Sequence, residues 1–419
     1  MISPGVLVLP RPHKSVAWAQ TVDILAVLIA AALPWSTSLV GILVVVWLVV
    51  LAPTIDLKSF VLTLRRPFCA LPIMLFVLAV VGTLWSEAPW SARLYAINPT
   101  AKLLVLPALI YHFHRSNRGA WVFIAFLASC MLLLVMSWIV ALEPRLTIKP
   151  IAEYGVPVKN YIDQSQEFAL CAVALAYLSV KFLDQRRFLA GTLFALLAMS
   201  FVINMAFVVV SRTALFTTPL VLIIFALLHL KRRGIVLAIC ISATLIGAAW
   251  FASPALRERA GSIISQYDLY KQSNKATSVG LRLEFWRKSL QFFAEAPLFG
   301  HGTGSTRALF QEAAAGQTGA AGEVIGNPHN QTLNVAVQWG ALGVLVLYVM
   351  WLVHLLLFRG SDLGSSIGLL VVIQNVMSSL FNSHLFDFHE GWMYVLGVGV
   401  AGGMTLKAKL GKSTSGSYT

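Results

Sequence analysis

Long apolar stretches separated by short polar connections constrain the fold of this chain more than any other feature. Each stretch is near the roughly 20 residues that an α-helix needs to cross the hydrocarbon core of a bilayer. The stretches are apolar throughout and do not alternate, which favours helices over the strands of a β-barrel. They lie at 17–33, 36–52, 68–85, 99–113, 119–142, 165–183, 188–210, 213–230, 234–252, 331–358, 364–382 and 389–406. We therefore predict an all-α polytopic membrane protein with about twelve transmembrane helices.

The composition excludes a soluble globular domain. Of the 419 residues, 58% are hydrophobic and only 11% are charged, whereas soluble domains carry about a quarter charged residues. The four cysteines all lie in apolar stretches and have no metal-ligand spacing, so we interpret them as small hydrophobic residues.

The net charge of +14 could suggest a nucleic-acid partner, but its distribution indicates membrane topology instead. Basic clusters fall in every second connection, as the positive-inside rule requires. We therefore expect no nucleic-acid partner, and a multi-pass inner-membrane protein with both termini in the cytoplasm. The clusters comprise Arg11 and Lys14; Lys58, Arg65 and Arg66; Arg115 and Arg118; Arg186 and Arg187; Lys231, Arg232 and Arg233; Arg359; and Lys407, Lys409 and Lys412.

The same pattern divides the chain into four parts. Helices one to nine occupy 1–252, a large outer loop with amphipathic helices occupies 253–330, and helices ten to twelve occupy 331–406. A Ser/Thr/Gly-rich tail, 407–419, is expected to be disordered. The apolar run 188–230 is interrupted only at Ser211-Arg212-Thr213, where two helices need a turn on the outer side. Residues 86–98 look like an interfacial turn with aromatic anchors.

Two outer arginines could bind phosphate, because a guanidinium offers forked donors that match phosphate oxygens. Arg212 lies where two apolar runs meet, and snorkelling to the interface is an equally good reading. Arg282 lies in an amphipathic part of the large loop, where a solvated basic face is the alternative. Arg287 and Lys288 are five and six residues further on, so they do not share one helical stripe with Arg282.

His329 is the strongest candidate for acid–base chemistry. It lies between Pro328 and Asn330, immediately before the tenth apolar stretch, and therefore at a helix N-terminus. The helix dipole disfavours imidazolium there, and a neutral imidazole can accept a proton. A structural role remains the alternative for a single loop histidine. His301, His384 and His389 are second-rank candidates on the same side.

Several kinds of site are missing from the sequence. There is no Walker loop, no HExxH, no GxSxG and no DxD pair of carboxylates, so we expect no metal and no cofactor. The outer carboxylates are scattered. Asp23 and Lys102 are the charged residues that we place within helices, and no paired acids of the kind found in proton-coupled transporters are evident.

Three short segments carry a resemblance to a known family. They are Pro297-Leu298-Phe299-Gly300-His301-Gly302-Thr303-Gly304, then Asn327-Pro328-His329-Asn330, then Gly340-Ala341-Leu342-Gly343. In this order, after an outer Ser-Arg and an Arg in an amphipathic stretch, they resemble the bacterial O-antigen ligases. That family shares a superfamily with O-antigen polymerases and protein O-oligosaccharyltransferases.

The resemblance implies a GT-C-like membrane glycosyltransferase with a periplasmic active site. The donor would be an O-antigen polysaccharide on undecaprenyl diphosphate, the acceptor a sugar hydroxyl of lipid A–core, and the surroundings membrane lipid, without metal or nucleotide. Arg212 and Arg282 would hold the diphosphate, and His329 would activate the acceptor hydroxyl with inversion at the anomeric carbon. His301, Arg287 and Asn330 are second-rank site residues.

Alternatives remain at this stage. An O-antigen polymerase or a protein O-oligosaccharyltransferase would use the same kind of donor with another acceptor. A transporter of lipid-linked glycans would be a different class of protein. It predicts polar groups buried at mid-membrane and often an internal repeat, neither of which is evident in the sequence.

Overall fold

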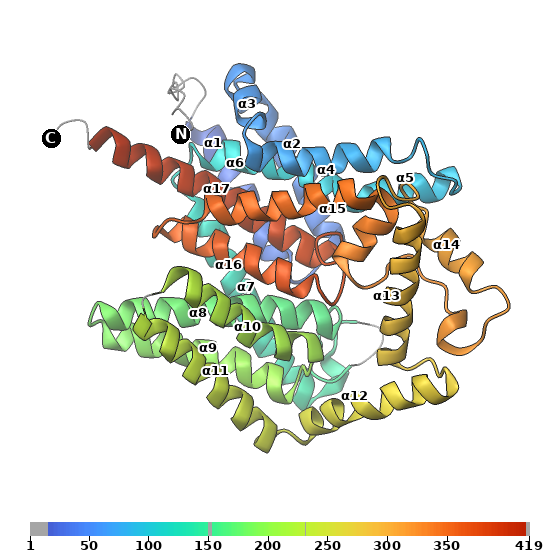
Figure 1. Ribbon diagram of the computed structural model, residues 1–419. Coiled ribbons are helices and arrows are strands. Elements are labelled where there is room, and N and C mark those ends of the chain that lie inside the picture. The colour runs from blue at the N-terminus through green and yellow to red at the C-terminus, as the bar shows by residue number, and fades with distance from the viewer. Residues whose placement is uncertain (1–15, 150–152, 231, 416–419) are drawn as a thin grey trace.

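A computed structural model describes residues 16–149, 153–230 and 232–415, and these ranges contain helices and no strand (Figure 1). The all-α prediction is confirmed. The helices are α1 (Val16–Ala32), α2 (Thr37–Leu51), α3 (Leu57–Leu64), α4 (Pro67–Val81), α5 (Trp90–Ala101), α6 (Val105–Phe113), α7 (Gly119–Leu142), α8 (Tyr161–Asp184), α9 (Phe188–Phe207), α10 (Arg212–His229), α11 (Arg232–Ala252), α12 (Pro254–Ser273), α13 (Ser278–Glu295), α14 (Thr306–Ala313), α15 (Gln331–Leu357), α16 (Leu363–Ser378) and α17 (Phe388–Ser415).

Ten of the twelve predicted apolar stretches form helices within four residues of the predicted bounds. The stretch predicted at 99–113 belongs to a span that begins at Trp90, and the last one, predicted to end at 406, continues to Ser415. By length and composition, six helices of the described ranges can cross a membrane, and a seventh can if the bent pair α3–α4 forms one span. Three shorter apolar helices lie at Trp18–Ala32, Phe216–Leu228 and Leu363–Ser378. The chain is therefore a polytopic membrane protein, while the count of twelve crossings stays a prediction.

The long apolar run 188–230 divides where predicted. Helix α9 ends at Phe207 and α10 begins at Arg212. Ser211 caps α10, because its hydroxyl accepts a hydrogen bond from the backbone N–H of Ala214 at 3.3 Å. Serine is a preferred N-cap residue for this reason.

The interfacial turn predicted at 86–98 is wrong. Helix α5 begins at Trp90 and continues through a short 3₁₀ segment into α6, as one span of 24 residues, Trp90–Phe113. Arg93 does not interrupt it, because its guanidinium folds back onto backbone carbonyls, Ala88 O at 2.5 Å and Thr83 O at 2.9 Å. A charged side chain that is satisfied locally is compatible with an otherwise apolar helix.

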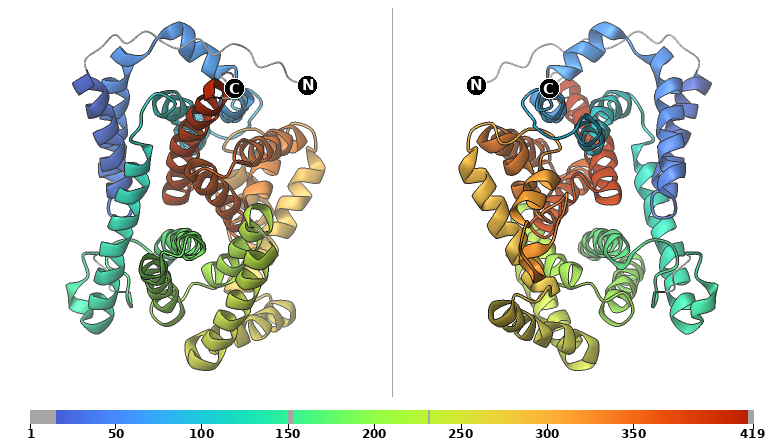
Figure 2. Two further views of the ribbon diagram at one scale, coloured as in Figure 1. Left: turned by 90° about the vertical axis from the view of Figure 1, so that its left-hand side faces the viewer. Right: turned by 90° about the vertical axis from the view of Figure 1, so that its right-hand side faces the viewer.

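The C-terminal helices form the centre of the assembly. Helix α16 packs against α17 and α10, α17 packs against α6, and α15 packs against α4. Their buried faces join one apolar cluster that also includes side chains of α1, α2 and α6. In Figure 2, α1, α2 and α7 form one flank of the molecule beside these helices.

Several predicted cytoplasmic clusters meet at one end of the assembly. Lys407 donates to the carbonyls of Arg115 and Ser116, and Lys409 donates to the carbonyl of Leu357. This end of α17 is helical as far as Ser415, where we expected a disordered tail; residues 416–419 lie outside the described residues. Helices α12, α13 and α14 lie at the opposite end (Figure 1).

A break in α15 receives the glycine-rich turn. Gly340 has non-helical angles, φ 59° and ψ −156°, and the segment 297–304 docks there. The N–H of Ala341 donates to Pro297 O at 2.8 Å, and the N–H of Gly302 donates to Gln338 O at 2.8 Å. Backbone groups left unpaired by the break are thereby satisfied. Two of the three sequence segments that carried the resemblance thus form one structural unit.

Candidate active site at one end of the helical assembly

His329 occupies a strained position just before α15. Its φ is 53°, which is uncommon for a residue other than glycine. Its backbone N–H donates to Asn327 Oδ1 at 3.0 Å, and Asn330 follows it as the N-cap of α15, accepting from the Leu333 N–H at 3.1 Å. Strain of this kind often marks functional sites.

The His329 ring contacts two other segments of the chain. Nδ1 lies 2.8 Å from Asn382 Oδ1, in the loop between α16 and α17. On another side lies the Phe285 ring of α13, with centroids 6.2 Å apart and planes inclined by 32°. The histidine is therefore fixed between α13 and the α16–α17 loop.

Burial among these neighbours lowers the pKa of His329 below its usual value, and the positive charge of Arg282 lowers it further. The hydrogen bond to Asn382 opposes this shift. The sequence predicted a neutral imidazole from the helix dipole, whereas the structure attributes it first to burial. The ring is consequently able to accept a proton near neutral pH.

Of the two candidate arginines of α13, Arg282 lies on the His329 side. It is half-buried and one helical turn from Phe285, and its charge acts on both His329 and His384. Arg287 forms an ion pair with Glu284 instead. Its Nη2 donates to Oε1 at 2.6 Å, and its Nε donates to Oε2 at 3.1 Å. Arg287 thereby stabilises α13 through its ion pair with Glu284.

Arg212 is the first residue of α10, and its side chain lies outside the described part of the structure. One turn later, the Phe216 ring contacts the Phe381 ring edge-on, with centroids 5.5 Å apart. Phe381 directly precedes Asn382, the partner of His329. The first turn of α10 thus adjoins the same loop as His329.

The remaining second-rank residues serve the scaffold. His301 Nε2 lies 2.8 Å from the carbonyl oxygen of Phe292, which joins the glycine-rich turn to α13. The Asn330 amide donates to Leu380 O at 3.1 Å, which joins the start of α15 to the α16–α17 loop. Neither contact suggests direct chemistry, but both help to hold His329.

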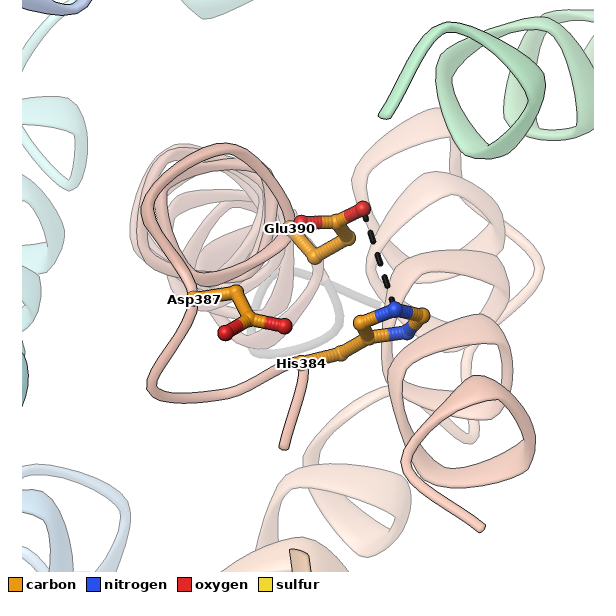
Figure 3. A group of neighbouring side chains, drawn as sticks. All are labelled: His384, Asp387 and Glu390. Atoms are coloured by element: carbon orange, nitrogen blue, oxygen red, sulfur yellow. Dashed lines mark ion pairs between the residues drawn. The ribbon is translucent and has the colours of Figure 1, made fainter. Parts of the chain in front are cut away.

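The α16–α17 loop holds His384, which the sequence had indicated as a second-rank candidate, together with carboxylates that sequence reasoning missed. His384, Asp387 and Glu390 gather where α17 begins (Figure 3), and His384 Nε2 lies 3.8 Å from Glu390 Oε1. In α8, Glu167 is fully buried and pairs with Lys159 at 3.2 Å. Our expectation that Asp23 and Lys102 are the charged residues within helices is therefore wrong. Polar residues crowded between two apolar stretches, 382–390, were the available signal.

One ligand atom from each of His384, Asp387 and Glu390 lies within 4.8 Å of the others, so these three could surround a cation. Asp387 also has another partner, because its Oδ2 accepts a hydrogen bond from the Asn382 amide at 2.7 Å. His389 lies beside this group and pairs with Asp163 of α8 at 2.6 Å. The group therefore forms part of the polar surroundings of His329.

An apolar cavity of about 300 Å³ lies between α1, α7, α8, α16 and α17. Its walls include Phe123, Leu127, Leu178 and Ile367, and the inner residues Val371 and Met393 also line a small cavity that reaches Glu390. Such an apolar lining is suited to binding a hydrocarbon group.

A family model matches part of the chain. Residues 194–348 match the family model described as O-antigen ligase. The matched range contains Arg212, Arg282 and His329, and it ends before the loop that holds Asn382. No curated protein matches the chain. The match supports the O-antigen ligase and polymerase superfamily that the sequence motifs indicated.

Proposed function

We propose that this chain, as a member of the O-antigen ligase and polymerase superfamily, is an O-antigen ligase. It would transfer O-antigen polysaccharide from undecaprenyl diphosphate to a sugar hydroxyl of lipid A–core in lipopolysaccharide biosynthesis. The observation that carries the proposal is the meeting of Arg282, a neutral His329 and the first turn of α10 at one end of a membrane-embedded helical assembly.

His329 is the general base of the proposed reaction. Its Nε2 takes the proton of the acceptor hydroxyl while that oxygen attacks C1 of the donor sugar. The C1–O bond to the diphosphate breaks, and undecaprenyl diphosphate leaves with the electron pair. Attack on the face opposite the leaving group inverts the anomeric centre. A positioned base contributes roughly 100- to 10,000-fold to such a rate.

Arg212 and Arg282 hold the diphosphate in this proposal. Negative charge grows on the leaving diphosphate as the C1–O bond breaks, and fixed guanidinium donors stabilise it. Each such contact lowers the barrier by about 3 kcal/mol. The half-buried position of Arg282 supports this role, because partial exclusion of water strengthens its interaction with an anion.

Donor and acceptor are both lipids, so their chains need apolar surroundings. We expect a sideways opening toward the outer leaflet of the inner membrane.

The proposed orientation has both termini in the cytoplasm and His329 facing the periplasm. It is supported by Lys407 and Lys409, near the C-terminal end of α17, which lies opposite α13 in Figure 1; Lys407 donates to the carbonyl of Arg115 there. Positive charge is retained on the cytoplasmic side of bacterial membranes.

The test uses purified protein in lipid nanodiscs with lipid-linked O-antigen as donor. One reaction contains lipid A–core, and the other contains donor alone. A ligase extends lipid A–core and leaves the donor unchanged in length. Longer donor chains would identify a polymerase instead, and no new product in either reaction would refute glycosyl transfer to both acceptors.

A further inference from the structure

A chain of three side chains leads from His329 into the protein interior. His329 Nδ1 lies 2.8 Å from Asn382 Oδ1, and Asn382 Nδ2 lies 2.7 Å from Asp387 Oδ2. Behind Asp387, the ammonium of Lys102 donates to the backbone carbonyls of Phe386, at 3.0 Å, and of Asp387. These residues come from the α15 entry, the α16–α17 loop and the span that contains α5 and α6.

The chemistry of these groups fixes the direction of each hydrogen bond. The Asn382 amide presents its NH₂ to Asp387, because its Nδ2 donates to the carboxyl oxygen Oδ2 at 2.7 Å. Its carbonyl oxygen then faces His329, and since that oxygen also only accepts, Nδ1 must carry the ring proton. The lone pair of the neutral ring is consequently on Nε2.

The ionised state of Asp387 depends on Lys102. Burial raises the pKa of Asp387 to about 7, and Asp163 raises it as well, while Lys102 and the Asn382 amide oppose the rise. Glu390 and His384 also lie beside this carboxyl group (Figure 3). Lys102 is itself only 8% exposed, so its charge is poorly screened and acts strongly on Asp387.

We propose that Asn382 is a positioning residue that, held by Asp387 and Lys102, keeps His329 in the tautomer with its proton on Nδ1. Nε2 is thereby the atom that accepts the proton of the acceptor hydroxyl. This inference rests on the proposed role of His329 as a base. It gives a function to a loop that lies outside the range matched by the family model.

The same contacts stabilise the ring after proton transfer. The imidazolium retains its Nδ1–H bond to Asn382, and the carboxylate of Asp387 lies one hydrogen bond further away. Arg282 of α13 and His384 of the loop are the other titratable or charged groups that act on or beside this ring.

The test compares variants of the full-length protein in nanodiscs with donor and lipid A–core. In Asn382→Leu we expect kcat to fall on the order of 100-fold, with KM for both lipids and the melting temperature near wild type. In Asn382→Asp, a carboxylate accepts the same Nδ1–H bond and raises the pKa of His329. Activity should therefore return in part, with the acid limb of kcat shifted to higher pH.

Two further variants and a control complete the design. Lys102→Met should lower kcat as Asn382→Leu does, and Lys102→Arg should restore part of it. Leu380→Ala changes a neighbouring loop side chain that is 40% exposed, and should behave as wild type. If Asn382 had only a structural role, Asn382→Asp would not shift the acid limb of the kcat–pH profile.

The outcomes separate this inference from the proposed function. If the wild-type protein joins O-antigen to neither acceptor, the proposed function fails. If the wild-type protein is active, three results would each overturn the role of Asn382. They are wild-type kcat in Asn382→Leu, a loss there that follows a fall in melting temperature, and an Asn382→Asp variant that is inactive or keeps the wild-type acid limb.

Discussion

The ring of His329 lies beside the ring of Phe285, 6.2 Å between centroids, although the two residues belong to separate segments of the chain. Phe285 is 4% exposed and packs with Phe292 and Phe310 in a small core of its own. The helix that carries Arg282 therefore also supplies the apolar wall that dehydrates His329. Phosphate binding and base strength are coupled through one helix in the proposed enzyme.

The role of His329 as general base gives the first prediction. His329→Ala should lower ligation at least about 100-fold while the protein still inserts in the membrane. The measurement is the lipopolysaccharide pattern of a ligase-null strain that carries the variant, with membrane levels checked by immunoblot. His301→Gln is the control, because glutamine can keep the hydrogen bond to Phe292 and should remain active. Full-length lipopolysaccharide with His329→Ala would contradict the assignment.

The two arginines of α13 should respond differently to substitution. Arg282→Ala should slow turnover of the donor about 100-fold, since one charge-assisted contact in the transition state is lost. Arg282→Lys should recover only part, because an ammonium lacks the forked donors. Arg287→Lys, which keeps a positive charge beside Glu284, should remain near wild type. Equal losses at both positions would show that α13 as a whole, rather than Arg282, is sensitive.

The pH dependence follows from the burial of His329. The base must be neutral, and burial lowers its pKa, so activity persists to a lower pH than an exposed histidine of pKa about 6.5 would allow. Phe285→Leu leaves a smaller apolar wall and should raise this pKa. The acid limb of kcat then moves to higher pH, and activity near pH 6 falls more than activity near pH 8. An unchanged acid limb in Phe285→Leu would show that Phe285 does not lower the pKa of His329.

The break in α15 should be intolerant of a side chain. A Cβ at Gly340 would lie 2.5 Å from the Leu298 backbone, and its φ of 59° is strained for other residues. Gly340→Ala should destabilise the protein by about 2 kcal/mol or more and lower activity, measured by thermal unfolding in detergent. Gly261→Ala is the matched control, because a Cβ there meets nothing within 4 Å and alanine favours the helix.

Treatment with a chelator tests the prediction that the transfer reaction needs no metal ion. Transfer should continue at an unchanged rate after EDTA treatment and dialysis, because arginines provide the positive charge that a metal would otherwise supply. His384, Asp387 and Glu390 make this a real test, since their ligand atoms lie within 4.8 Å of one another. Recovery of an EDTA-inactivated enzyme on addition of a divalent ion would count against the prediction. Glu390→Gln would then show whether this cluster holds the ion.

The local pattern of apolar residues in the sequence was sufficient to predict much of the fold. Hydrophobic length gave the positions of most of the apolar helices, and the single arginine within 188–230 gave the boundary between α9 and α10. Residues 86–98 were misread as a turn with aromatic anchors, although α5 begins at Trp90. The guanidinium of Arg93 instead bonds nearby carbonyls, a contact that no periodicity encodes.

The site was only partly visible in the sequence. His329 and Arg282 could be selected because they lie in recognisable segments, and the structure brings both to one end of the assembly. Asn382 could not be selected, since it contacts His329 although the two residues are 53 positions apart in the sequence. Glu167 and Glu390 were missed for a related reason, because their burial depends on helices that meet only in the folded chain.

Lys102 lies 284 residues before Phe386, whose carbonyl it binds. During synthesis, the span that carries this lysine is made long before the loop that satisfies its ammonium. A chain that stops before α17 therefore retains an unsatisfied cation in an apolar segment, which is costly in a bilayer. We expect such truncated chains to be degraded faster than the full chain in a pulse–chase experiment, and Lys102→Met to slow their loss. The hydrogen bonds of Lys102 would then also determine whether a chain is degraded, because only the full-length protein can form them.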